Sequence, residues 1–364
     1  MRVAIAAGGT AGHAVPALAV AEALRTRGDE VVFFGGERAE AELVPAAGFT
    51  FHQLKLAGLD RRDPLKAARA VWLAWRGVLA ARRLLKQERI EAVMAGGGYV
   101  AGPVGMAAVT LRLPLVVTEA DAHLGVANRL LAPFARRVCL AFELDGHDDD
   151  KYVVTGRPIA PRQPDLQSAA ARRSFGLPED GDCLLVFGGS LGARTLNRAT
   201  IDAYADGVPE GLCVLHLSGR GDFTACRELI DSHPALADAA AHARYRLFDF
   251  TEHFDVALAA ADICVCRAGG SIFELAAAGL PSILVPYPYA TADHQAKNAE
   301  WLVDGGAAQM VRDEDLSGER LRTTVGELLA NRQALATMAA AALHLAKPDA
   351  AERIADQLIA VGVR

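Results

Sequence analysis

The sequence predicts an α/β protein built from two Rossmann-like domains, each organised around a parallel β-sheet. Short apolar and β-branched runs alternate with helical patterns, as expected where helices connect parallel strands. An apolar run followed by Gly-Gly, a hydroxyl residue, any residue and Gly occurs twice, at residues 3–12 and 183–192. The length of 364 residues also exceeds what one hydrophobic core usually fills.

The first half contains five apolar runs with the character of buried parallel strands. They are residues 3–7, 31–34, 92–95, 115–118 and 137–142. A helix over about residues 16–27 is expected after the glycine turn at 8–12. The proline-rich residues 155–164 predict a linker. We therefore expect domains at 1–157 and 167–345, a linker at 158–166, and a last helix within 346–364 that returns to the first domain.

The second half contains a run at 183–187, then strands near Val214, Arg246 and Ala308. Its most informative segment is 262–298. It predicts a strand at 263–266, a glycine-rich turn, a helix at 272–278 and a second strand at 282–285. Ligands of open α/β sheets bind beyond the carboxyl ends of such strands, and a helix N-terminus there suits a phosphate or diphosphate.

Composition excludes several classes of protein. The net charge of −6 argues against nucleic acid as a partner. The six cysteines include no C-x-x-C pair, which indicates buried thiols in a reducing compartment, not disulfides or zinc. We expect no signal peptide, because the first strand runs directly into a glycine turn, and no membrane span, because the long uncharged stretches contain glycines and prolines.

Residues 61–89 carry nine basic and two acidic side chains, a local charge of +7. On a helix, Leu65, Trp72, Trp75 and Leu79 share one face, and Arg69, Arg76 and Arg83 border it. Two interpretations remain open. The face packs on the core and has a solvated basic edge, or it lies on an anionic lipid surface.

Five motifs together carry a resemblance that none carries alone. They are residues 8–19, 97–103, 188–193, 267–269 and 293–299. A single glycine loop after a strand is weak evidence, and neither loop has the G-x-G-x-x-G spacing of dinucleotide-binding proteins. In combination, and over essentially the whole chain, the motifs resemble the peptidoglycan N-acetylglucosaminyltransferases.

The resemblance implies the GT-B fold, in which two Rossmann-like domains face an interdomain cleft. It implies inverting transfer of N-acetylglucosamine from UDP-N-acetylglucosamine to undecaprenyl-diphospho-N-acetylmuramoyl-pentapeptide (lipid I), giving lipid II. The expected location is the cytoplasmic face of the cell membrane, with peripheral attachment to its anionic surface. No cofactor, metal or nucleic acid is expected. No Asp-x-Asp follows a strand where metal-dependent transferases hold their nucleotide, and the acidic residues 145–150 predict a solvated loop.

The resemblance also implies roles for individual residues. His13 is the first candidate for the catalytic base and Glu119 the second, although His13 alone also fits an ordinary histidine at a helix start. Donor-binding residues are Thr10, Ala11, Gly12, Asp121, Arg162, Ser190, Gly270, Ser271, Glu274, Gln295 and Asn298. Acceptor-binding residues are Gly97, Gly98 and Tyr99. Ser271 and Glu274 also have the S-x-x-E spacing of a capping box, which offers a purely structural role for Glu274.

Three positions depart from the family pattern. Residues 118–121 read Thr-Glu-Ala-Asp, so Asp121 stands where the family has an asparagine. Ala160 stands where the family has an arginine, although Arg157 and Arg162 lie close by in the sequence. The turn from Arg267 to Glu274 is one residue shorter than in the family. These departures leave other functions open. The alternatives are a transferase for another lipid or natural-product acceptor, a UDP-sugar epimerase of the same fold, and a UDP-sugar-binding protein without catalysis.

Overall fold

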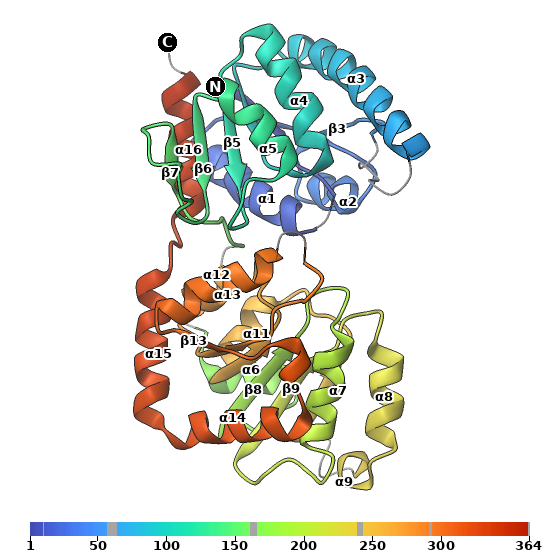
Figure 1. Ribbon diagram of the computed structural model, residues 1–364, viewed down its shortest axis with the longest axis vertical. Helices are drawn as coiled ribbons and strands as arrows, with labels where there is room; N and C mark the ends of the chain where they lie inside the picture. Colours follow the sequence, from blue (N-terminus) through green and yellow to red (C-terminus); the bar gives the residue numbers. More distant parts are fainter. Residues whose placement is uncertain (10, 57–63, 161–165, 239–242, 291–292, 363–364) are drawn as a thin grey trace. The chain divides into compact units, whose positions relative to one another are not determined.

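The computed structural model describes residues 1–9, 11–56, 64–160, 166–238, 243–290 and 293–362. The chain divides into two compact units (Figure 1). The first unit contains Met1–Pro161 and Lys347–Arg364, and the second contains Arg162–Ala346.

The first unit is built on a parallel sheet of seven strands in the order β3-β2-β1-β4-β5-β6-β7. The strands are β1 Arg2–Ala6, β2 Glu30–Gly35, β3 Thr50–Gln53, β4 Ala92–Ala95, β5 Leu115–Glu119, β6 Arg137–Leu140 and β7 Tyr152–Val154. The five predicted strands are confirmed with ends that shift by at most two residues. The edge strands β3 and β7 were not predicted, because a strand paired on one side is only half buried and lacks a continuous apolar run.

Helices cover both faces of this sheet (Figure 1). They are α1 Ala11–Thr26, α2 Ala39–Ala46, α3 Pro64–Gln87, α4 Gly98–Leu111, α5 Val126–Leu131, η1 Ala132–Phe134 and α16 Ala350–Gly362. Side chains of α3, α4 and α5 pack on one face of the sheet, and those of α1 and α16 on the other. The last helix, α16, packs directly against α1.

Helix α1 begins five residues before the predicted start, at Ala11 instead of residue 16. The prediction was wrong because proline favours the first turn of a helix, so Pro16 suggested a helix start. In the structure Pro16 lies inside the helix instead. The earlier start places His13 in the first turn of α1.

The second unit is built on a parallel sheet of six strands in the order β10-β9-β8-β11-β12-β13. The strands are β8 Asp182–Phe187, β9 Leu212–Leu217, β10 Tyr245–Phe248, β11 Ile263–Cys266, β12 Ser282–Leu284 and β13 Ala308–Met310. All six were predicted, and every residue of β9, β11 and β12 is buried. The connecting helices are α6 Ser168–Ser174, α7 Arg194–Ala203, α8 Phe223–Asp231, α9 Pro234–Ala237, α11 Phe254–Ala260, α12 Ile272–Ala278, α13 His294–Asp304, η3 Asp313–Asp315, α14 Gly318–Ala330 and α15 Arg332–Leu345.

Two expectations from composition can be compared with the structure. All six cysteines are buried free thiols, as predicted. Within the described residues, we find no helix that combines the length and apolar character needed to cross a membrane.

Candidate active site

The glycine motifs of the first unit meet where the strand order reverses. Strand β1 pairs with β2 on one side and with β4 on the other, so the loops after β1 and β4 leave the same edge of the sheet. Gly98 has a φ of +75°, and a Cβ atom there would lie 1.9 Å from the carbonyl oxygen of Gly8. The two loops therefore touch, and only glycine permits this approach.

His13 lies beside these loops, in the first turn of α1. A Cβ atom on Gly97 would lie 3.0 Å from its Cδ2 atom, so the imidazole occupies the space above the Gly97 backbone. Burial lowers the pKa of His13 below its ordinary value of 6.5, and the charge of Arg157 lowers it further, while Asp121 and Glu40 act in the opposite direction. The neutral imidazole that results at pH 7 can accept a proton.

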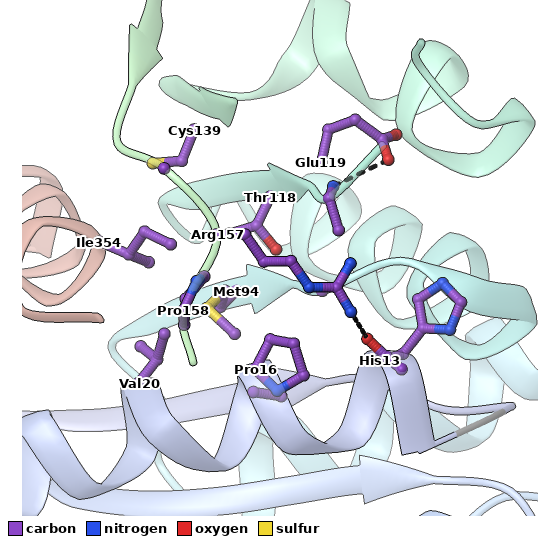
Figure 2. A pocket seen from close by; sticks show the side chains of 15 residues that line it. His13, Pro16, Val20, Met94, Thr118, Glu119, Cys139, Arg157, Pro158 and Ile354 are labelled. Atoms are coloured by element: carbon purple, nitrogen blue, oxygen red, sulfur yellow. Dashed lines mark hydrogen bonds between the residues drawn. The ribbon is translucent and has the colours of Figure 1, made fainter. Parts of the chain in front are cut away.

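A small cavity of about 20 Å³ opens beside His13 (Figure 2). Its polar lining comes from the start of α1, from the end of β5 and from the segment after β7, through His13, Thr118, Glu119 and Arg157. A cavity of this size accommodates about one water molecule, so it is too small for a sugar.

Glu119 is buried, and its carboxylate is fully engaged by the loop that follows β5. It accepts hydrogen bonds from the backbone N–H groups of Ala120, Asp121 and Gly125, and from Asn128 Nδ2, over 2.8–3.1 Å. Burial raises the pKa of Glu119, and the bonds from Gly125, Asn128 and Asp121 oppose that rise. Because four hydrogen-bond donors occupy this carboxylate, Glu119 is better suited to stabilising the loop after β5 than to accepting a proton as the catalytic base.

Glu40, a buried carboxylate next to the glycine loops, was not predicted as a site residue. Glu40 is 1% exposed. It accepts hydrogen bonds from the backbone N–H groups of Gly9 at 3.0 Å and Gly36 at 2.9 Å, and the Tyr99 hydroxyl donates to it at 3.4 Å. The same carboxylate thus joins the loops after β1 and β2 to a predicted acceptor residue. Burial raises the pKa of Tyr99, and the Glu40 charge adds to the effect.

We expect Glu40→Gln to lower the free energy of unfolding by about 1–3 kcal/mol. Glutamine retains one acceptor oxygen but turns an NH₂ group toward a backbone N–H, which leaves a buried donor unpaired. Urea titration followed by circular dichroism measures the change. Glu42→Gln is the matched control, because Glu42 lies on the same helix and is exposed. Equal unfolding midpoints for the two variants would contradict this role of Glu40.

In the second unit, the strand order reverses between β8 and β11. Ser190 lies in the exposed part of the loop after β8, and Gly270 and Ser271 lead from β11 into α12. The capping-box interpretation is wrong for Ser271, which has helical backbone angles and whose side chain caps no backbone N–H. Glu274 lies in the first turn of α12 and is partly exposed.

The remaining donor-motif residues brace the two loops that follow β11 and β12. Gln295 Oε1 accepts a hydrogen bond from Tyr287 N at 2.9 Å. Asn298 is fully buried, and its Nδ2 donates to Ala268 O at 3.2 Å. Arg267 donates to the carbonyl oxygens of residues 285 and 286 and pairs with Asp313. Asn298 therefore supports the turn from the protein interior, whereas a residue that binds the UDP-sugar would have to face solvent.

Some predicted site residues cannot be placed. Thr10 and Arg162 lie outside the described residues, and the side chain of Ala11 is not described. The acidic residues of 145–150 are exposed, as predicted. Over the described part of the chain, no group of three or more His, Cys, Asp or Glu side chains has a geometry that could hold a metal ion.

The face of α3 that carries the tryptophans does not pack on the core. Trp72, Trp75 and Leu79 are 53%, 62% and 50% exposed, so the core-facing interpretation is wrong for these residues. The opposite side of the helix is buried through Ala70, Ala81 and Leu85 instead. The Arg76 guanidinium lies 4.8 Å from the centre of the Trp72 ring.

Comparison with known proteins identifies the class that this architecture represents. Residues 3–140 match the glycosyltransferase family 28 N-terminal domain, and residues 183–354 match the glycosyltransferase family 28 C-terminal domain. The chain is therefore a two-domain glycosyltransferase. The crystal structure of Acinetobacter baumannii MurG aligns with a TM-score of 0.76 at 32% identity over 99% of both chains, which confirms the GT-B fold class.

Curated relatives identify the family within this class. A relative from Acidithiobacillus ferrooxidans is 42% identical over 356 residues, covering 97% of this chain and 96% of its own length. One from Desulforamulus reducens is 37% identical over 359 residues, covering 96% of both chains. The chain belongs to their family, the UDP-N-acetylglucosamine–N-acetylmuramyl-(pentapeptide) pyrophosphoryl-undecaprenol N-acetylglucosamine transferases. This confirms the resemblance drawn from the motifs.

More distant structures share only the fold. A putative UDP-N-acetylglucosamine 2-epimerase from Listeria monocytogenes aligns with a TM-score of 0.72 over 97% of this chain and 94% of its own, at 16% identity. At that identity the likeness supports no shared reaction.

Proposed function

We propose that this enzyme transfers N-acetylglucosamine from UDP-N-acetylglucosamine to undecaprenyl-diphospho-N-acetylmuramoyl-pentapeptide, which converts lipid I to lipid II. The observation that carries the proposal is full-length similarity, at 37% and 42% identity, to relatives whose names state this transfer. The arrangement within each unit supports it, because the motif residues follow strands at the point where the sheet order reverses.

The chemistry follows from the residues that each unit offers. In the second unit, backbone N–H groups at the start of α12 suit the diphosphate of the donor, and the Glu274 carboxylate suits the ribose hydroxyls. The acceptor hydroxyl gives its proton to neutral His13 and attacks the anomeric carbon from the face opposite UDP. The new glycosidic bond forms as the bond to UDP breaks, which inverts the configuration. The same N–H groups stabilise the charge that develops on UDP.

A direct assay tests this reaction. Purified protein is incubated with labelled UDP-N-acetylglucosamine and lipid I, with a competing lipid acceptor, or without acceptor. We expect equal amounts of lipid II and UDP, formed only when lipid I is present. Faster transfer to the other acceptor would indicate a transferase with a different acceptor. Epimerised UDP-sugar without acceptor would indicate an epimerase, and binding without turnover would indicate a UDP-sugar-binding protein without catalysis.

The outer face of the first unit suggests a location on an anionic membrane. Exposed Leu130 and Phe134, at 65% and 56%, extend from the α5–η1 segment on the side of the sheet that α3 also covers. Exposed aromatic and aliphatic side chains beside arginines are typical of helices at a lipid interface. We therefore propose peripheral attachment of the first unit to the cytoplasmic face of the membrane, where its lipid-linked acceptor would lie.

Replacing Arg69, Arg76 and Arg83 by glutamine should weaken vesicle binding about 100-fold, since each basic residue near an anionic surface contributes about 1 kcal/mol. All three side chains lie on α3 and are exposed. Co-sedimentation with phosphatidylglycerol vesicles measures the loss, and UDP affinity should not change. The charge-matched control replaces the exposed Arg173, Arg198 and Arg320 of the second unit. Equal sedimentation of both triple variants would rule out attachment through α3.

A further inference from the structure

The start of α1 contains a carbonyl group that cannot make its usual helical hydrogen bond. In an α-helix the carbonyl of residue 12 accepts from the N–H of residue 16, but Pro16 has no N–H group. Arg157 Nη2 donates to the Gly12 carbonyl oxygen at 2.7 Å instead (Figure 2). A charged side chain thus replaces a missing backbone bond directly before His13.

The backbone next to Arg157 is anchored by hydrogen bonds and close packing, which fixes the point from which its side chain extends. The N–H groups of Thr155 and Gly156 both donate to the Leu140 carbonyl oxygen, at 3.0 Å and 3.1 Å. Gly156 has a φ of +88°, and a Cβ atom there would lie 2.7 Å from Lys347 Cβ. Pro158 follows and is buried. This anchored segment directs the Arg157 side chain toward the first turn of α1.

The same guanidinium contributes to the electrostatic surroundings of His13. Arg157, His13 and Glu119 line one small cavity. Among the charged groups that act on the imidazole, Arg157 favours its neutral form, whereas Asp121 after β5 and Glu40 from α2 favour its protonated form. Arg157 therefore opposes two carboxylates that favour the protonated imidazole, and it acts in the same direction as burial, which is the largest influence on the pKa of His13.

We propose that Arg157 is a positioning residue for His13. It holds the first turn of α1 through the Gly12 carbonyl and keeps a positive charge beside the imidazole, so that His13 meets the acceptor hydroxyl as a neutral base. The functional half of this inference depends on the proposed role of His13, whereas the effect of Arg157 on the imidazole can be measured without any reaction.

Two variants test the charge. Arg157→Gln removes the charge and ends short of the Gly12 carbonyl, whereas Arg157→Lys keeps the charge. Without the Arg157 charge, protonation of His13 is less unfavourable, so the pKa of His13 should rise. The acidic limb of kcat/KM should move to higher pH by the same amount in Arg157→Gln and remain near that of the parent in Arg157→Lys.

NMR titration of ¹⁵N-labelled histidine in the full-length protein without substrate gives the direct result, with the His13 signal identified by its loss in His13→Gln. Arg136→Gln, which removes an exposed arginine of the same unit, is the control and should leave the titration of His13 unchanged. A folded Arg157→Gln variant in which His13 titrates as in the parent would overturn the inference, as would an equal shift in Arg157→Lys. If His13→Ala retains activity, the proposed base fails, but the titration result for Arg157 still stands.

Discussion

His13→Ala is expected to lower kcat by about 10²- to 10⁴-fold, the usual contribution of a general base. Its affinity for UDP should remain close to that of the parent, because the groups proposed to bind the diphosphate and the ribose, the N–H groups at the start of α12 and Glu274, lie in the second unit. The expectation rests on a neutral imidazole in the first turn of α1, above the backbone of Gly97. Steady-state kinetics with saturating UDP-N-acetylglucosamine and lipid I measures the effect.

Two controls separate chemistry from folding. His344→Ala removes an exposed histidine of α15 and should leave kcat unchanged. The melting temperature of His13→Ala should lie within a few degrees of the parent value. A kcat within a few-fold of the parent would mean that His13 has only a structural role at the start of α1.

The pH dependence of the parent enzyme follows from the same residue. A base acts only when unprotonated, so kcat/KM should fall as the pH drops through the pKa of His13 in the free enzyme. Because burial and Arg157 hold that pKa below 6.5, the acidic limb should lie below pH 6.5. His13→Ala should lose this limb along with most of its activity.

Sequence patterns predicted helices and strands most accurately where the residues of the pattern themselves determine where the helix or strand begins and ends. Strand β11 and helix α12 were predicted to the residue, because a short buried run meets a glycine turn and Gly279 then ends the helix. The start of α1 was predicted wrongly because of Pro16, which is the sixth residue of the helix. A proline is tolerated there because Arg157 donates to the Gly12 carbonyl oxygen in place of the missing N–H group. Periodicity identified the aromatic stripe of α3, but only the packing of Ala81 and Leu85 shows that the stripe faces outward.

The site residues likewise include some that the sequence predicted and some that it did not. His13 and Gly97 were both predicted as site residues, and the structure places the His13 imidazole beside the Gly97 backbone. Glu40 was missed because its partner Gly9 is 31 residues away, and an acidic residue in the first turn of a helix is common. Long-range hydrogen bonds of this kind have no local sequence signature. For the same reason, the sequence could not show that Asn298 is buried beneath a turn, where its partner Ala268 is 30 residues away.

Glu274→Gln is expected to weaken UDP binding by about 10- to 100-fold. The proposed carboxylate accepts hydrogen bonds from both ribose hydroxyls, and bonds that involve a charged group contribute about 1.5–3 kcal/mol, with 1.4 kcal/mol corresponding to about tenfold in affinity. Glutamine has nearly the same shape but carries no charge and offers a single acceptor oxygen.

The structure sharpens this test, because Ser271 forms no side-chain cap on α12 and the reciprocal capping box is therefore incomplete. A helix-capping role would predict a loss of thermal stability without ligand, whereas ribose binding predicts a loss of UDP affinity at nearly constant stability. Calorimetric titration with UDP, alongside thermal unfolding of the free protein, distinguishes the two. Glu300→Gln, an exposed change on α13, is the control. Unchanged UDP affinity in Glu274→Gln would require a different anchor for the nucleotide, and the neighbouring Ser190 loop after β8 would be the next segment to change.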